Sequence, residues 1–176
     1  MPFLNSYKLA FRRFVAYMVD FIFLAIIIFV FQFALSYLTG FPSSKHLKTS
    51  WQIYAWVLVS VSLPVYLYFI ISERSLKQAT LGKNIWKIKV VSRNDGVIST
   101  RQSILRNLIK IAIPWEMTHI SILFPRPLFY ADDPNIPFGI YLVDVILLLY
   151  LLVFIFTKGR MTIHDYLSNT RVIFKS

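Results

Sequence analysis

Four stretches of this chain are apolar over a length that can cross a lipid bilayer: Phe14–Leu38, Ile53–Ile71, Ser103–Phe124 and Phe138–Phe156. A helix needs roughly 17–25 residues to span the hydrocarbon core of a membrane. Lipid offers no hydrogen-bond partners, so a segment of this kind satisfies its backbone groups by forming a helix. The sequence therefore predicts an all-α membrane protein, a bundle of four transmembrane helices.

Composition supports one membrane domain over residues 1–176. Hydrophobic residues make up 57% of the chain and charged residues 15%, against about 45–50% and 25% in soluble domains. The chain has no cysteine, which excludes a disulfide framework, a thiolate metal site and a thiol nucleophile. We expect no cofactor and no bound metal.

The third stretch is the most polar of the four, and the distribution of basic residues decides how it is interpreted. Fifteen of the 19 basic residues lie in residues 1–13, in residues 72–106 and after Phe156. If these segments are cytoplasmic, both termini are cytoplasmic and the number of spans is even. We therefore expect the third stretch to cross. The same bias accounts for the net charge of +11, so we expect no nucleic-acid partner.

A cleaved signal peptide is the alternative interpretation of the N-terminus. The sequence Ala34-Leu35-Ser36 resembles a cleavage site. The apolar run before it is about 25 residues long, whereas the apolar region of a signal peptide usually has 7–15. We expect this stretch to remain as the first span.

Residues 83–99 have the pattern of a small β-structure on the cytoplasmic side. Apolar residues alternate with lysines over residues 86–90, and Asn94-Asp95-Gly96 is typical of a hairpin turn. Residues 97–99 are the expected return strand, and the C-terminal TRVIFK run could add a third strand. Ser99 and Gln102 have the spacing of a capping box that opens the third helix.

Asp20 lies inside the first apolar stretch, where a carboxylate is costly. Arg13, Ala16 and Asp20 share one helix face, and Asp20 lies roughly 9 Å into the apolar region at 1.5 Å per residue. Asp20 is either a proton- or cation-binding carboxylate or one half of a structural ion pair. We expect its partner to be Arg13 or another basic group at the cytoplasmic surface, because an unpaired carboxylate at that depth tends to protonate.

A second aspartate lies in the C-terminal sequence RMTIHDYLSNTRV. Thr162 and Asp165 have the spacing of a capping box, so Asp165 is expected to accept from free backbone N–H groups. His164 is a possible proton carrier because histidine titrates near neutral pH. A capped cytoplasmic turn is the simpler interpretation.

Asp144 is a polar residue expected in the outer half of the bundle, near the outer edge of the fourth stretch. One interpretation is an acid hydrogen-bonded to another helix, for example to Arg126 or His119. The other is an outer counterpart to Asp20, about 12 Å away along the membrane normal. Glu116 and His119 form one E-x-x-H pair. Bundle di-metal sites need two such pairs and further glutamates, so this pair is not expected to bind metal.

The sequence also resembles the RDD family of membrane proteins, which is named for one arginine and two aspartates. The resemblance rests on RRFVAYMVD, ATLGKNIWKIKVVSRNDG, an arginine downstream and HDYLSNTRV. It implies that Arg13, Asp20 and Asp165 are the family residues, that residues 80–83 are its Thr-Leu-Gly-Lys stretch and that Arg106 is its later arginine. Glu116, His119 and Asp144 are not recognised as family features.

The resemblance implies a polytopic protein of the bacterial cytoplasmic membrane, for which transport or cation/proton exchange is the expected activity. Its partners would be the lipid bilayer and protons or monovalent cations. The alternative is a non-catalytic adaptor or stability factor for another membrane protein. Either kind of protein could form a homo-oligomer. No nucleophile or phosphate-binding motif is present, so we do not expect an enzyme.

Overall fold

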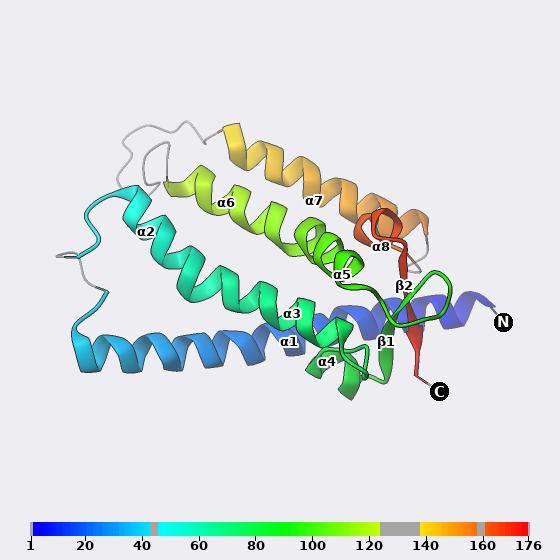
Figure 1. Cartoon of the computed structure of the whole chain (residues 1–176). Coiled ribbons are helices and arrows are strands. Elements are labelled where there is room, and N and C mark those ends of the chain that lie inside the picture. The colour runs from blue at the N-terminus through cyan, green and yellow to red at the C-terminus, as the bar shows by residue number, and fades with distance from the viewer. Residues whose placement is uncertain (1, 43–45, 124–137, 158–160, 176) are drawn as a thin grey trace.

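The computed structural model describes residues 2–42, 46–123, 138–157 and 161–175. Its first element, helix α1, runs over Pro2–Thr39 and is longer than the apolar stretch it contains. Figure 1 shows α1 along the whole length of the molecule, with the other long helices beside it. Both chain ends lie at the same end of this bundle (Figure 1).

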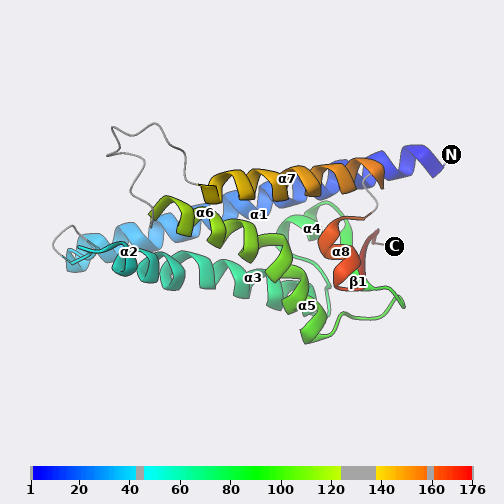
Figure 2. The ribbon, with the colours of Figure 1, turned by 90° about the horizontal axis from the view of Figure 1, so that it is seen from above.

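The second and third apolar stretches each form one continuous helical rod with a short π-helical segment inside it. The second rod consists of α2 (Ser50–Val57), η1 (Leu58–Ser62) and α3 (Leu63–Arg74). The third consists of α5 (Thr100–Asn107), η2 (Leu108–Ala112) and α6 (Ile113–Leu123). The last long helix, α7, covers Phe138–Phe156. It packs against α6 and lies beside that helix in both Figure 1 and Figure 2.

Each π-helical segment ends two residues before a proline, Pro64 in the second rod and Pro114 in the third. Proline has no backbone N–H, and its ring clashes with the carbonyl four residues back. A π turn widens the helix locally and relieves that clash. The two rods therefore remain helical through their prolines.

All four predicted stretches are helical over their described residues; Phe124, the last residue of the third, lies outside them. Two helical segments, Tyr7–Thr39 and Ser50–Arg74, are long and apolar enough to cross a membrane. Ser99 caps α5 and forms the expected capping box with Gln102.

The end of the bundle that holds both termini carries four short elements, which we call the base. They are α4 (Leu81–Ile85), β1 (Ile88–Ser92), α8 (Ile163–Leu167) and β2 (Thr170–Phe174). The two strands are antiparallel, with Val90 opposite Val172. Side chains of the strands form an apolar core with Leu9 and Ala16 of α1.

The hairpin expected at residues 83–99 is wrong in its second strand, and β1 pairs directly with the C-terminal strand. The Asn94-Asp95-Gly96 turn is present, closed by a bond from the Ser92 N–H to the Gly96 carbonyl of 3.0 Å. Ser99 is already the cap of α5, so too few residues remain for a return strand. Ile98 is instead buried in the core of the base.

Candidate functional site

Asp20 is fully buried and accepts three hydrogen bonds, all from neutral donors. Tyr68 Oη donates to Oδ1 at 2.7 Å, Thr80 Oγ1 donates to Oδ2 at 2.5 Å, and the Gly82 N–H donates to Oδ1 at 2.7 Å. Two of these donors lie at the start of α4. Asp20 therefore fixes the Thr-Leu-Gly-Lys turn against α1.

At Gly82 the backbone of α4 lies close against the backbone of α1. A Cβ atom at this position would lie 2.0 Å from the carbonyl oxygen of Ala16. That distance is far below any van der Waals contact, so the helices can approach this closely only with glycine at residue 82. Thr80 caps α4, and its hydroxyl accepts from the Lys83 N–H.

The expectation that Asp20 pairs with Arg13 is wrong. Arg13 Nη2 lies 2.5 Å from Oδ2 of Asp165. The two α1 residues are seven positions apart, which is roughly 10 Å along a helix axis. Arg13 therefore contacts Asp165 of α8, whereas Asp20 lies about two turns farther along α1 and binds the start of α4.

Asp165, which is also fully buried, lies between two guanidinium groups. Arg13 binds its Oδ2, and Arg106 Nη1 binds its Oδ1. The Thr162 N–H donates to Oδ2 at 3.0 Å, as the predicted capping box requires. Burial by itself would raise the pKa of Asp165, but Arg106 and Arg13 outweigh it and hold that pKa well below its usual range. Asp165 is therefore ionised and joins α1, α5 and α8.

Glu73, a fully buried acid at the end of α3, is a further member of this site that none of the sequence patterns above indicated. Lys83 Nζ binds its Oε1, Arg106 Nε lies 3.0 Å from its Oε2, and Lys110 Nζ lies 3.7 Å from its Oε1. Arg106, only 1% exposed, thus bridges Glu73 and Asp165. The position of Glu73 beside the basic segment 74–106 was a signal that could have found it.

His164 lines the same region and has one unsatisfied nitrogen. Its Nε2 lies 2.8 Å from Thr162 Oγ1. The Thr162 hydroxyl also lies 2.7 Å from Asp165 Oδ2, and its donation to that carboxylate assigns the donor role to Nε2 and leaves Nδ1 as an acceptor. Nδ1 has no hydrogen-bond partner within the described ranges. Burial, with Arg106 next in importance, lowers the pKa of His164.

The three outer candidates do not join this site. Glu116 accepts from Tyr66 Oη at 2.5 Å, and His119 Nδ1 lies 2.9 Å from the Trp115 carbonyl. Asp144 is exposed and so does not face the interior as a counterpart to Asp20.

Arg126, the other partner considered for Asp144, lies outside the described residues. Within those residues no three potential ligands from His, Cys, Asp and Glu are grouped as a metal site would require.

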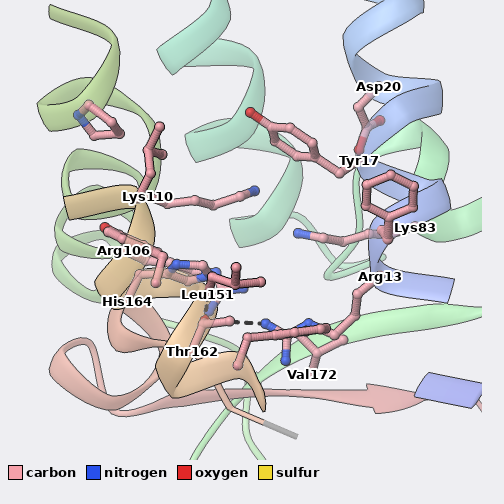
Figure 3. A pocket seen from close by; sticks show the side chains of 15 residues that line it. Arg13, Tyr17, Asp20, Lys83, Arg106, Lys110, Leu151, Thr162, His164 and Val172 are labelled. Atoms are coloured by element: carbon pink, nitrogen blue, oxygen red, sulfur yellow. Dashed lines mark hydrogen bonds between the residues drawn. The ribbon is translucent and has the colours of Figure 1, made fainter. Parts of the chain in front are cut away.

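A cavity of about 440 Å³ adjoins these charged groups. Its polar lining includes Arg13, Asp20, Lys83, Arg106, Lys110 and His164. Figure 3 shows Lys83 and Lys110 pointing into it from opposite sides, with Arg13 and Thr162 nearby. Apolar residues of α1 and α7 complete the wall. We call this space the charged cavity.

The arrangement groups the sequence candidates as follows. Arg13, Arg106, His164 and Asp165 form one connected cluster, and Asp20 lines the same cavity through a separate set of contacts.

Comparison with curated proteins and with solved structures found no match. A family model, described as the RDD family, matches residues 7–169. The chain therefore belongs to the RDD family and is an integral membrane protein.

Proposed function

We propose that this protein is a small transporter or cation/proton exchanger, that the charged cavity is its ligand site and that Asp20 is the carboxylate that takes up and releases the proton. The observation that carries the proposal is the cavity of about 440 Å³, which Asp20 lines together with four cationic side chains. Buried ionisable groups of membrane proteins commonly mark ion and proton pathways.

Asp20 suits proton exchange better than the other buried acids because its hydrogen-bond donors are neutral. The hydroxyls of Tyr68 and Thr80 can donate to a carboxylate or rotate to accept from a protonated acid. Protonation of Asp165 would remove the carboxylate charge that the guanidinium groups of Arg13 and Arg106 both contact. Protonation of Glu73 would likewise remove the carboxylate charge that Lys83 and Arg106 contact.

The proposal includes four spans with the base and both termini in the cytoplasm. It is supported by the four helical segments, by the position of both termini at one end (Figure 1) and by the basic residues of that end.

The absence of cysteine from the chain permits a direct test of this topology with single-cysteine variants. Asp95→Cys should be protected from an impermeant maleimide in intact cells, and Lys48→Cys should react. Equal reactivity of the two positions would contradict an arrangement in which they lie on opposite sides.

The transport proposal is tested by proton-coupled sodium and potassium flux into vesicles that contain only this purified protein. Asp20→Asn should reduce flux to the level of protein-free vesicles, because asparagine keeps the shape of aspartate but cannot cycle between charged and neutral forms. Asp95→Asn, at an exposed aspartate of the base, is the matched control and should transport normally. Unchanged flux in a folded Asp20→Asn protein would reject the proposal.

An adaptor function is the second candidate, and the small sheet favours it. In the described part of the chain β2 pairs only with β1, so one edge of β2 is open. An exposed edge can accept a strand from another protein. Wild-type vesicles without any flux, together with a β2-dependent complex with another membrane protein, would favour this function.

A further inference from the structure

We infer that the charged cavity binds a phosphate group, presented by an amphiphile whose apolar part lies against α1 and α7. The inference rests on the proposed function only in taking this cavity as the ligand site. It adds the chemical class of the ligand, which comes from the charge, the free hydrogen-bonding groups and the apolar wall of the cavity.

The charge of the cavity favours an anion. Four cationic side chains surround it, namely Arg13, Lys83, Arg106 and Lys110. They face three carboxylates in the described residues, those of Asp20, Glu73 and Asp165. With all of these groups ionised, one positive charge is left without a counterpart. A buried positive charge is costly unless an anion accompanies it.

Lys110 is the cation with unused donors. Its Nζ is 3.7 Å from the nearest oxygen of Glu73 and donates no hydrogen bond within the described ranges. The ammonium instead lies over the rings of Phe69, at 4.3 Å from the centroid, and Tyr17, at 5.2 Å. An ammonium has three N–H donors, and in Figure 3 this one points into the cavity. A phosphate oxygen is a suitable acceptor for it.

His164 supplies the complementary acceptor. It is 6% exposed, lines the cavity, and its bare Nδ1 has no partner in the described part of the chain. A phosphate monoester that carries a proton, or a hydroxyl next to the phosphate, can donate to this nitrogen. Unpaired buried polar atoms are rare in folded proteins, and this one belongs to a residue that lines the cavity.

The apolar wall indicates that the phosphate is carried by an amphiphile. Phe14 of α1 and Leu147, Leu151 and Phe154 of α7 line the cavity. The two helices pack mainly against other elements, α1 against α4 and α7 against α6. The charged groups adjoin the start of the apolar stretch of α1, at the depth where lipid headgroups lie if the base is cytoplasmic. An acyl chain could leave the cavity between α1 and α7.

The inference is tested by measuring the binding of three probes to the protein in detergent. Thermal shift and calorimetry measure that binding. The probes are inorganic phosphate, dioctanoyl phosphatidic acid and dioctanoylglycerol, which has the same chains without the phosphate. Dioctanoyl phosphatidic acid should bind and raise the Tm, and dioctanoylglycerol should not. Comparable binding of inorganic phosphate would support the same phosphate site, filled from solution instead of from the membrane.

Two lysine variants separate this site from general surface charge. Lys110→Gln should weaken binding of the phosphatidic acid by about tenfold or more, because it removes a charge-assisted hydrogen bond. Lys77→Gln makes the same change at an exposed lysine outside the cavity and should leave the affinity unchanged. Leu151→Trp, which fills the cavity without altering charge, should also weaken binding and serves if Lys110→Gln does not fold.

The inference is overturned if dioctanoylglycerol binds as well as the phosphatidic acid, if none of the probes binds, or if both lysine variants weaken binding equally. These outcomes are independent of the flux measurement. Phosphate binding without ion flux would leave the inference standing and reject the transport function. Flux without phosphate binding would do the reverse.

Discussion

Asp20 and Asp165 occupy different electrostatic environments, although both are fully shielded from solvent. Asp165 lies at the centre of the base between Arg13 and Arg106. Asp20 lies farther along α1 and binds two hydroxyls and one backbone N–H of α4 and its neighbours. Burial is the same in the two places, and the charge of the partners differs.

This difference suits Asp165 to holding helices together and Asp20 to the proton exchange proposed above. Breaking a buried ion pair is strongly destabilising because it leaves an uncompensated charge. Asp165 therefore must stay ionised for α1, α5 and α8 to remain together. The proposed exchange at Asp20 needs only the Tyr68 and Thr80 hydroxyls to rotate, because neither partner is charged. The charge of the partners, more than depth in the bundle, sets what each carboxylate can do.

The largest expected effect comes from Asp165→Asn. The change removes the negative charge that Arg13 and Arg106 share, and unpairing a buried charge costs about 3–5 kcal/mol. This is far more than the loss of a helix cap, typically about 1 kcal/mol. Thermal unfolding in detergent and the yield of monodisperse protein would measure it.

Asp20→Asn is the matched comparison for Asp165→Asn. It should lower stability less, by about 1–3 kcal/mol, because it disturbs hydrogen bonds but leaves no guanidinium group unpaired at contact distance. Equal losses of stability in the two variants would refute the distinction between the two aspartates.

Gly82→Ala tests the geometry of the Asp20 environment. The added Cβ would overlap the carbonyl of Ala16 at 2.0 Å, so α4 must move away from α1 and the Gly82–Asp20 hydrogen bond must lengthen. Overpacking of this kind costs about 1–3 kcal/mol. The expected result is a lower Tm together with reduced flux.

Gly96→Ala is the control for Gly82→Ala, because a Cβ at Gly96 meets nothing within 4 Å. It should leave both Tm and flux nearly unchanged. A Gly82→Ala protein as stable and active as Gly96→Ala would show that the close approach of α4 and α1 is dispensable.

His164 makes the Asp165 environment sensitive to mild acid. Burial and Arg106 lower the pKa of His164 in the folded protein, whereas the unfolded chain has the ordinary value of about 6.5. Below that pH the unfolded state binds a proton that the folded state does not, so stability falls as the pH falls. The slope is at most about 1.4 kcal/mol per pH unit.

Thermal unfolding between pH 7.5 and 5.5 would measure this slope, and His164→Gln should flatten it. Asp165 adds little to the slope in this range, because its pKa is held well below its usual value when folded. Its contribution is lost only as the pH falls through that depressed value. A wild-type protein that becomes more stable at pH 5.5 would contradict the assignment.

The long helices could be predicted from the sequence because their signals are local. Apolar runs of bilayer length define helices regardless of their neighbours, and the Ser99–Gln102 capping box depends on four adjacent residues. The strand pairing could not be predicted in the same way. β1 looked like half of a hairpin, but its partner β2 lies about 80 residues later in the chain, and no local pattern encodes that distance.

The site was predictable in its residues but not in its pairing. Asp20 could be named from its place in an apolar stretch, Asp165 from its capping-box spacing, and both of them together with Arg13 from the family resemblance. The helix spacing then suggested an Arg13–Asp20 pair, whereas Arg13 contacts Asp165, 152 positions away. Glu73 was missed because it follows the second apolar run and resembles an ordinary charged boundary residue. Its burial depends on Lys83 and Arg106, which only the fold brings to it.

The smallest expected effect concerns an exposed ion pair that contrasts with both buried aspartates. Arg171 of β2 binds Asp95 in the turn after β1, and the two side chains are 42% and 63% exposed. Solvent screens such a pair, and exposed ion pairs typically contribute about 0.2–1 kcal/mol. Asp95→Asn should therefore change the Tm only slightly, and salt should reduce the difference further. A loss as large as that of Asp165→Asn would mean that charge pairing matters equally at the surface and in the interior, and the contrast between buried and exposed carboxylates in this protein would fail.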